Sequence, residues 1–295
     1  MQERLNIKEI LNRTTEHFEE YGIQTPRLDA EVLLSNLLGI ERIELYVNFD
    51  RPLEKEEIDE YRQRVIERSK HIPVAYIIGH WEFMSLDFKV NQDVLIPRPE
   101  TEHLVETISQ HIRDNTKESL TVVDLCTGSG AVIISLAVEL KDTTKQINYI
   151  ATDISEEALK IAKENAKHHG VIGQIKFLQG DLLKPIKNLD EEVDILLSNP
   201  PYIPDEELQQ LQPELEYEPE IALKGGEDGL EFYRRIIDQS ANILAEDGLV
   251  ALEVGDQQAT DVQKLLLKKN FTRIKVLDDY AEIPRVVLGH NNLED

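Results

Sequence analysis

Cysteine and long apolar runs are scarce in this chain of 295 residues. The single cysteine, Cys126, cannot form an internal disulfide and excludes a cysteine-rich metal site. The longest apolar runs, such as VIISLAVEL, are too short to cross a bilayer, and the N-terminal MQERLNIKEI does not resemble a secretion signal. These absences predict a globular, cytoplasmic protein with no metal site and no membrane partner.

Basic residues are also few, since 32 lysines and arginines stand against 57 aspartates and glutamates, a net charge of −25. A duplex nucleic acid would have to bind against its own like charge, so we expect no direct duplex partner. The same acidity can serve solubility alone, and it is compatible with a local basic patch.

The first 75 residues are rich in helix formers. Apolar residues recur at three- and four-residue steps in the segments 7–11 and 28–37, which predicts several amphipathic helices in a small bundle. The pair Thr25 and Pro26 is typical of a helix cap followed by a first-turn proline. We therefore predict that residues 1–75 form a separate helical domain.

A different pattern begins at Pro73. The stretch VAYIIGHWEFMSLDFKVNQDVLI is rich in β-branched and aromatic residues and predicts strands, arranged as a hairpin between two domains. The following IPRPETEHLVETI predicts a helix with Pro99 in its first turn. We expect a hairpin linker over residues 76–97 and a second domain over residues 98–295.

Strand, turn and helix alternate after residue 119. Apolar runs separated by helical segments such as SEEALKIAKENAKHHG predict a mostly parallel sheet covered on both faces, a doubly wound α/β fold. In such sheets ligands bind beyond the carboxyl ends of the strands, so the residues that follow each run are the candidates for a site. The predicted strands are SLTVVDLC, INYIATD, IKFLQGD, VDILLSN and GLVALEV.

The first strand leads into DLCTGSG at 124–130. Its glycines let the backbone turn sharply and approach a nucleotide-like ligand, although a tight strand-to-helix turn explains them as well. Asp153 ends the second strand, where this architecture often has a ribose-binding acid. The alternative role for Asp153 is a helix cap, which Ser155 can fill more naturally.

The third strand leads to Asp181 and Leu182, an acid that can accept a hydrogen bond from an exocyclic amino group and an apolar residue that can pack on a ring. The fourth strand runs into Asn199-Pro200-Pro201-Tyr202. A turn accounts for the prolines only. In this order, the four strand ends resemble class I methyltransferases that use S-adenosylmethionine, and among them the amino methyltransferases marked by Asn-Pro-Pro-Tyr.

The resemblance is closest to the release factor glutamine methyltransferase family and covers the chain from about residue 73 to the end. It implies a Rossmann-like domain with a seven-stranded sheet, S-adenosyl-L-methionine as the cofactor, and a helical first domain that engages the substrate. The implied activity is methylation of the side-chain N5 of the glutamine in the Gly-Gly-Gln motif of peptide chain release factors, in translation termination. The motifs that carry it are IPRPETE at 96–102, DLCTGSG at 124–130, SNPPYI at 198–203 and EPEIALKGGEDGLEFYR at 218–234.

The resemblance also implies roles for single residues. The Asn199 side-chain oxygen and the Pro200 carbonyl would accept both N–H bonds of the substrate amide, so that the nitrogen lone pair points to the methyl group. Tyr202 would stack on the amide, and the catalytic residues would be Asn199, Pro200 and Tyr202. The implied cofactor-binding residues are Cys126, Thr127, Gly128, Ser129, Gly130, Asp153, Asp181, Leu182 and Asn199. The implied substrate-binding residues are Asn199, Pro200, Pro201, Tyr202, Arg98 and Glu100.

Two alternatives stay open on the sequence. Asn-Pro-Pro-Tyr also suits a nucleic-acid enzyme that methylates an exocyclic amine of adenine or guanine, although such an enzyme should carry a basic groove. The second alternative is a non-catalytic module that keeps the pocket and docks on translation factors, against which the intact tetrapeptide argues. We expect the protein to be a monomer. Glu102 suits a helix start as well as a functional role.

Overall fold

The computed structural model describes residues 5–187 and 192–291 and divides the chain into two units. A short segment far along the sequence belongs with the N-terminal helices, so the chain leaves unit 2 after Leu211 and returns to it at Glu218. Within the described ranges, no helix has the length and apolar character needed to cross a membrane. Unit 1 comprises Met1–His80 and Gln212–Tyr217, and unit 2 comprises Trp81–Leu211 and Glu218–Asp295.

Unit 1 is helical, as predicted. Pro26 lies in the first turn of its second helix, as predicted, and the left-handed Gly39 ends that helix. Side chains such as Leu11, Phe18 and Leu33 are fully buried and form the core of this unit. The helices are α1 (Ile7–Glu20), α2 (Pro26–Leu38), α3 (Arg42–Val47), α4 (Lys55–Arg68), α5 (Val74–Ile78) and the 3-10 helix η4 (Pro213–Tyr217).

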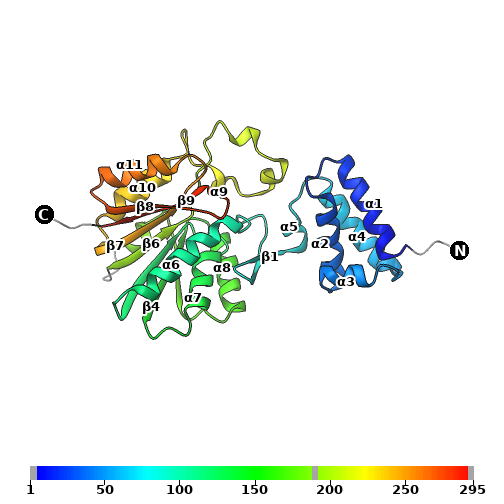
Figure 1. Cartoon of the computed structure of the whole chain (residues 1–295), viewed down its shortest axis with the longest axis horizontal. Coiled ribbons are helices and arrows are strands. Elements are labelled where there is room, and N and C mark those ends of the chain that lie inside the picture. Colours follow the sequence, from blue (N-terminus) through cyan, green and yellow to red (C-terminus); the bar gives the residue numbers. More distant parts are fainter. Residues whose placement is uncertain (1–4, 188–191, 292–295) are drawn as a thin grey trace. The chain divides into compact units, whose positions relative to one another are not determined.

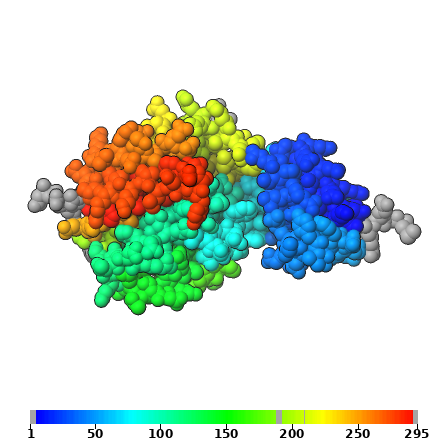
Figure 2. Space-filling view, viewed as in Figure 1, coloured from blue at the N-terminus to red at the C-terminus, as the bar shows by residue number. Residues whose placement is uncertain are grey.

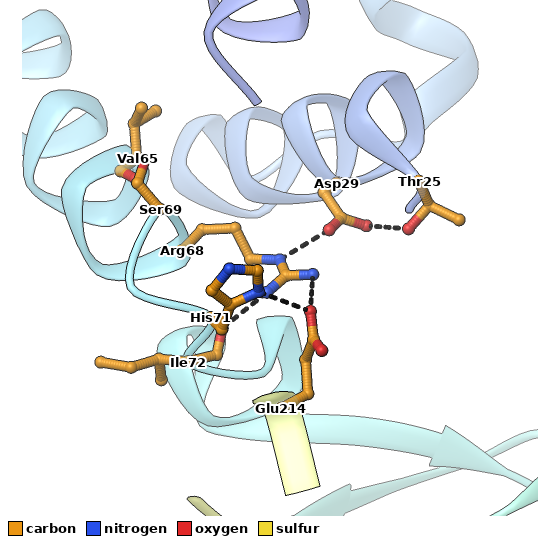
Figure 3. Close-up of polar contacts among 8 residues, drawn as sticks. All are labelled: Thr25, Asp29, Val65, Arg68, Ser69, His71, Ile72 and Glu214. Atoms are coloured by element: carbon orange, nitrogen blue, oxygen red, sulfur yellow. Dashed lines mark hydrogen bonds and ion pairs between the residues drawn. The ribbon is translucent and has the colours of Figure 1, made fainter. Parts of the chain in front are cut away.

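A buried arginine connects three segments of unit 1 (Figure 3). Arg68 donates from Nε to Asp29 Oδ2 at 2.7 Å and from Nη2 to Glu214 Oε1 at 2.8 Å. Thr25 donates its hydroxyl to Asp29 Oδ1 at 2.7 Å, so it orients this carboxylate and makes no side-chain cap on α2. The segment that carries Glu214 is therefore fixed to helices α2 and α4.

The predicted strand character from Pro73 onward is wrong for Val74–Ile78, which form helix α5. Pro73 precedes the helix and Gly79, with a φ of +82°, ends it. The side chains of Val74, Ile77 and Ile78 pack against the core of unit 1. Burial outweighs the weak helix preference of β-branched residues here, because propensity is only a small energy per residue.

The hairpin is correspondingly shorter than predicted. Its strands are β1 (His80–Phe83) and β2 (Leu86–Lys89), which form a two-stranded sheet, while residues 90–97 contain no strand. Met84 and Ser85 both have positive φ, the backbone that a two-residue hairpin turn requires. Glu102 accepts the Met84 backbone N–H at 2.7 Å, so this acid supports the turn.

Unit 2 contains the predicted doubly wound sheet, with seven strands in the order β5-β4-β3-β6-β7-β9-β8. The pairs among β3 to β7 are parallel, whereas β9 runs antiparallel to both β7 and β8. The prediction of a mostly parallel sheet is therefore confirmed. The strands are β3 (Ser119–Leu125), β4 (Gln146–Asp153), β5 (Ile175–Gln179), β6 (Val193–Ser198), β7 (Leu244–Glu253), β8 (Thr272–Asp278) and β9 (Pro284–His290).

Helices cover both faces of this sheet. In Figure 1, α6, α7 and α8 lie on one side of the strands and α10 and α11 lie on the other, and each side has its own apolar core. Such coverage explains why the central strands are apolar without alternation. The longer helices are α6 (Glu102–Asp114), α7 (Ala131–Glu139), α8 (Glu156–His168), α10 (Glu231–Ser240) and α11 (Ala259–Lys268). The shorter ones are α9 (Glu220–Leu223), η1 (Pro99–Thr101), η2 (Lys184–Ile186) and η3 (Leu208–Gln210).

The segment between β8 and β9 reaches helix α6 at the surface of unit 2. The Tyr280 backbone N–H donates to His103 Nε2 at 3.2 Å, and the two rings are 4.2 Å apart. In the space-filling view, the orange and red C-terminal residues border the green ones (Figure 2). The segment between β8 and β9 therefore packs against α6 within unit 2.

Candidate active site

The carboxyl ends of four parallel strands meet at one edge of the sheet. Leu125 of β3 lies beside Thr152 of β4 and Ser198 of β6, and Asp153 lies beside Gln179 of β5. The loops that follow these strands are far apart in the sequence. The parallel register brings the glycine loop, both candidate acids and Asn-Pro-Pro-Tyr to a single edge, as the strand-end rule predicts.

A pocket of about 140 Å³ opens at this edge. A smaller pocket of about 50 Å³ shares Cys126, Gly128 and Asn199 with it and is also lined by Arg98, Thr127 and Ser129. The predicted site residues that line the larger pocket are Cys126, Gly128, Asp153, Asp181, Leu182, Asn199 and Pro201. Those that line neither pocket are Gly130, Glu100, Pro200 and Tyr202.

The glycine loop is folded around left-handed residues. Gly128 has a φ of +55°, and a Cβ built on it would meet no atom within 4 Å, so this backbone is open to a ligand. A Cβ on Gly130 would lie 2.7 Å from Ile134 Cδ1, so that glycine serves the close packing of α7 and α8. Burial raises the pKa of the Cys126 thiol, which argues against a nucleophilic role.

Asp153 supports this loop directly. Its Oδ2 accepts the Gly128 N–H at 2.9 Å and its Oδ1 accepts the Ser155 N–H at 2.9 Å. Ser155 is the cap of α8, since its hydroxyl accepts the Ala158 N–H at 3.0 Å. Asp153 is therefore not the helix cap, and burial raises the pKa of its carboxyl.

Asp181 is paired with cations of its own chain. Arg235 donates to both of its oxygens, at 2.5 and 2.6 Å, and Lys184 Nζ lies 2.8 Å from Oδ2. Hydrogen bonds from Lys184 and Arg235 lower the pKa of Asp181 below its ordinary value. A ligand amino group would have to share this carboxylate with Arg235. Leu182, next in the chain, is buried with a φ of +51°.

Asn199 follows the last residue of β6. Its Nδ2 donates to Thr101 Oγ1 at 3.2 Å. Among the described residues its carbonyl oxygen has no recorded hydrogen bond, and the side chain lines both pockets. The Asn199 amide therefore presents an acceptor to the site and has a donor fixed behind it.

Tyr202 is held by the glycines of the run KGGEDG. A Cβ on Gly225 would lie 2.7 Å from the Tyr202 backbone, and one on Gly229 would lie 2.4 Å from the Tyr202 carbonyl oxygen. Gln258 Nε2 donates to the same carbonyl at 2.9 Å. The glycines are therefore needed for close approach to Tyr202. Burial raises the pKa of the Tyr202 phenol to about 12, so the phenol is neutral.

Arg98 makes an ion pair with Glu218, whose Oε2 also accepts the Ile96 N–H at 3.1 Å. Glu218 is buried and begins the run EPEIALKGGEDG. The motif at 96–102 is thus fixed to the one at 218–234. Glu100 lies in the short helix η1, where its backbone carbonyl accepts the Glu102 N–H.

Two buried residues of the site were missed by sequence reasoning. Thr101 accepts from Asn199. Glu253, at the end of β7, is a buried acid close to Thr101. Burial raises the pKa of Glu253 to about 7. A signal did exist for Glu253, because it is an acid at the carboxyl end of the buried run GLVALEV.

The strand order and the position of the glycine loop define a methyltransferase of the doubly wound class. Residues 116–271 match the family described as methyltransferase domain, and residues 9–79 match the PrmC N-terminal domain. The chain is 39% identical to the release factor glutamine methyltransferase of Clostridium acetobutylicum, over 97% of this chain and 98% of that protein. It is 38% identical to that of Moorella thermoacetica, over 98% and 100%. The chain belongs to the release factor glutamine methyltransferase family.

Among solved structures, the hMettl16 catalytic domain in complex with MAT2A 3′UTR hairpin 1 is similar, with a TM-score of 0.56 over 82% of each chain. The identity is 16%, so this likeness shows a shared fold and nothing about the substrate.

Proposed function

We propose that this enzyme transfers a methyl group from S-adenosyl-L-methionine to the side-chain N5 of the glutamine in the Gly-Gly-Gln motif of peptide chain release factors. The observation that carries the proposal is the Asn199 amide, whose N–H is bonded to Thr101 and whose oxygen is left as an acceptor between two pockets. An amide nitrogen is a weak nucleophile, because its lone pair is delocalised into the carbonyl. A site that methylates an amide nitrogen therefore needs hydrogen-bond acceptors that fix both of its N–H bonds.

The cofactor would lie in the larger pocket. Gly128 would let the backbone approach the ligand, Asp153 would accept from ribose hydroxyls, and Leu182 would pack on the adenine. Thr127 and Ser129 would complete the loop around it, and Asp181 would share its carboxylate with Arg235. The fit is supported by the open space above Gly128 and by the carboxylates at the pocket wall. When bound, S-adenosyl-L-methionine supplies an electrophilic methyl group on a sulfonium.

The tetrapeptide would hold the substrate amide. Asn199 Oδ1 and the Pro200 carbonyl would accept its two N–H bonds, so that the lone pair is directed out of the amide plane. Tyr202 would stack on the amide, and Pro201 would keep the loop stiff before the substrate arrives. Positioning of this kind contributes roughly 7–11 kcal/mol in favourable cases. The nitrogen loses its proton readily after methylation, so no strong general base is required.

The remaining residues support a division of labour. We propose that residues 1–75 recognise the release factor, that residues 76–97 link the domains, and that residues 98–295 carry out methyl transfer. Arg98 and Glu100 would contact the substrate from the motif beside Glu218. A cytoplasmic, monomeric enzyme remains our prediction.

The alternative, methylation of an exocyclic amine of a nucleic acid, requires a basic surface around the site. The net charge of −25 argues against this substrate. In addition, Arg235, which lines the larger pocket, is already paired with Asp181. This substrate is therefore the weaker proposal.

The test incubates the purified protein with radiolabelled S-adenosyl-L-methionine and a release factor. We expect label on the wild-type factor and none when its Gly-Gly-Gln glutamine is replaced by asparagine, with mass spectrometry placing one methyl on that glutamine. Label that persists after the replacement would disprove the proposed substrate atom. Asn199→Ala should abolish transfer. An unchanged biological output in this variant would favour a module that only docks on translation factors.

A further inference from the structure

Asn199 is backed by two buried polar residues from other segments, Thr101 and Glu253. Thr101 is 5% exposed, and its Oγ1 receives the Asn199 Nδ2 hydrogen bond of 3.2 Å. Glu253, which is 1% exposed, lies close enough to Thr101 for its carboxyl to be influenced by the Thr101 hydroxyl. Asn199 and Thr101 both line the smaller pocket, whereas Glu253 lines neither of the two pockets.

Glu253 has little structural support for a buried carboxyl. Its Oε2 has no hydrogen-bond partner among the described residues. The nearby Arg285 instead bonds Asp279 and the Val254 carbonyl. Burial of an unpaired carboxylate is costly, and a well-packed apolar residue usually stabilises such a position better. A role in packing alone therefore does not account for Glu253.

The donor and acceptor capacities of Asn199, Thr101 and Glu253 set the direction of the hydrogen bonds among them. Above its pKa of about 7 the Glu253 carboxylate is ionised and can only accept, so the Thr101 hydroxyl then donates to Glu253. The lone pairs of Thr101 Oγ1 then remain as acceptors for an N–H, and the Asn199 amide must turn its nitrogen towards Thr101. Its oxygen is left facing the pockets. Without Thr101 and Glu253, Asn199 could turn either its amide oxygen or its amide nitrogen towards the pockets, because the two have nearly the same shape.

We propose that Thr101 and Glu253 are positioning residues that hold the Asn199 amide with its oxygen towards the substrate. The inference rests on the proposed function, since a substrate N–H is what that oxygen would accept. The groups facing Glu253 are Arg98, Glu100, Tyr202, Tyr233 and Arg285. None of these groups donates a hydrogen bond to the Glu253 side chain in the described structure. The orientation of the Asn199 amide is therefore set by Thr101.

The first test compares Thr101→Val with Thr101→Ser in the full chain. Valine keeps the shape and removes the hydroxyl, so we expect kcat for release factor methylation to fall roughly 10- to 100-fold, as for a misoriented reactant. The KM for S-adenosyl-L-methionine should stay within about twofold of wild type. Serine restores the hydroxyl and should bring kcat back to within about threefold. Equal losses in both variants would overturn the proposal.

The second test uses Glu253→Gln, which keeps size and shape. A glutamine can donate to Thr101, whose hydroxyl can then donate to the oxygen of Asn199 and turn its nitrogen towards the substrate. We expect the same loss of kcat with unchanged cofactor KM. Wild-type kcat in Glu253→Gln would overturn the proposal. This result would be decisive even if circular dichroism shows that Thr101→Val does not fold.

The matched control is Ser135→Ala, a buried hydroxyl in α7 outside the site, for which we expect unchanged kcat. The two proposals fail in different ways. A wild-type protein that does not methylate the release factor contradicts the proposed function. An active wild type with fully active Thr101→Val and Glu253→Gln variants contradicts only the positioning role.

Discussion

At the scale of single residues, the cofactor loop depends on carboxyls buried beneath it. Asp124 is 2% exposed and accepts the Thr127 hydroxyl at 2.6 Å, while Asp153 accepts the Gly128 N–H. Burial, with the nearby charge of Asp153, raises the pKa of Asp124 to about 7. The loop is therefore built on a carboxyl that prefers to be protonated, which gives its stability a pH dependence.

We predict that replacing Asp124 by Asn flattens that dependence. A carboxyl whose pKa is higher in the folded than in the unfolded protein binds a proton more tightly when folded, so it favours folding at low pH. This contribution is lost as the pH rises from about 4, the ordinary value, to about 7. The melting temperature of unit 2 should therefore fall less between pH 5 and pH 8 in Asp124→Asn than in wild type. Glu253→Gln should act in the same direction, and an unchanged pH slope in both would contradict the assignment.

A second prediction concerns Ser135, whose buried hydroxyl lacks a hydrogen-bond partner in the described part of the chain. Ser135→Ala removes an unsatisfied polar group and places a better helix former in α7. We expect the free energy of unfolding to rise by about 1 kcal/mol, measured by urea titration of the transition assigned to unit 2. A fall in stability would mean that the hydroxyl has a partner that the structure does not show.

At the scale of elements, sequence patterns predict what backbone and burial determine locally. The apolar runs that became β3, β4, β5, β6 and β7 were predictable, because buried parallel strands are apolar throughout. The helix α5 at Val74–Ile78 was not predictable, because tertiary packing outweighs the strand preference of its residues. Thr101 was also missed, because its role depends on Asn199 and Glu253 from distant strand ends, and no local pattern reports such a meeting.

The turn from β3 into α7 yields a prediction at this scale. Gly130→Ala would place a side chain at a φ of +80°, 2.7 Å from Ile134 and 3.1 Å from Ala162. Gly170→Ala, after α8, is the matched control, because its φ is +73° with no atom within 4 Å. We expect the control to lose about 1–2 kcal/mol from backbone strain. Gly130→Ala should lose roughly 1–3 kcal/mol more from overpacking. Equal melting temperatures for the two variants would refute this explanation of Gly130.

At the scale of the whole molecule, the net charge of −25 bears on the choice of substrate. We predict that an excess of duplex DNA does not slow methylation of a release factor at low salt, because the DNA is repelled by like charge. The measurement is the initial rate with and without DNA at about 50 mM and about 200 mM salt. Strong inhibition that disappears at the higher salt would reveal a basic groove and favour the nucleic-acid alternative.

The path of the chain is the second property of the whole molecule. Between Asn-Pro-Pro-Tyr and the glycines that pack on Tyr202, the chain enters unit 1 for the segment Gln212–Tyr217. Arg68 and His71 bind Glu214 there, and Tyr217 donates its hydroxyl to the Lys70 carbonyl at 2.7 Å. Unit 1 therefore includes a short segment that lies, in the sequence, between two motifs of unit 2.

The corresponding prediction compares Glu214→Gln with Glu216→Gln, its exposed neighbour in η4. Burial raises the pKa of Glu214, but hydrogen bonds from Arg68 and His71 outweigh it and lower the pKa below 4.5. A lowered pKa stabilises the folded state above the ordinary value, and the stabilisation is lost as the pH falls through the lowered one. We expect Glu214→Gln to reduce the free energy of unfolding by roughly 1–3 kcal/mol at pH 7 and by less at pH 3. Glu216→Gln should match wild type at both pH values. A Glu214→Gln variant as stable as Glu216→Gln would show that Asp29 alone satisfies Arg68, and that Glu214 does not hold the segment Gln212–Tyr217 in unit 1.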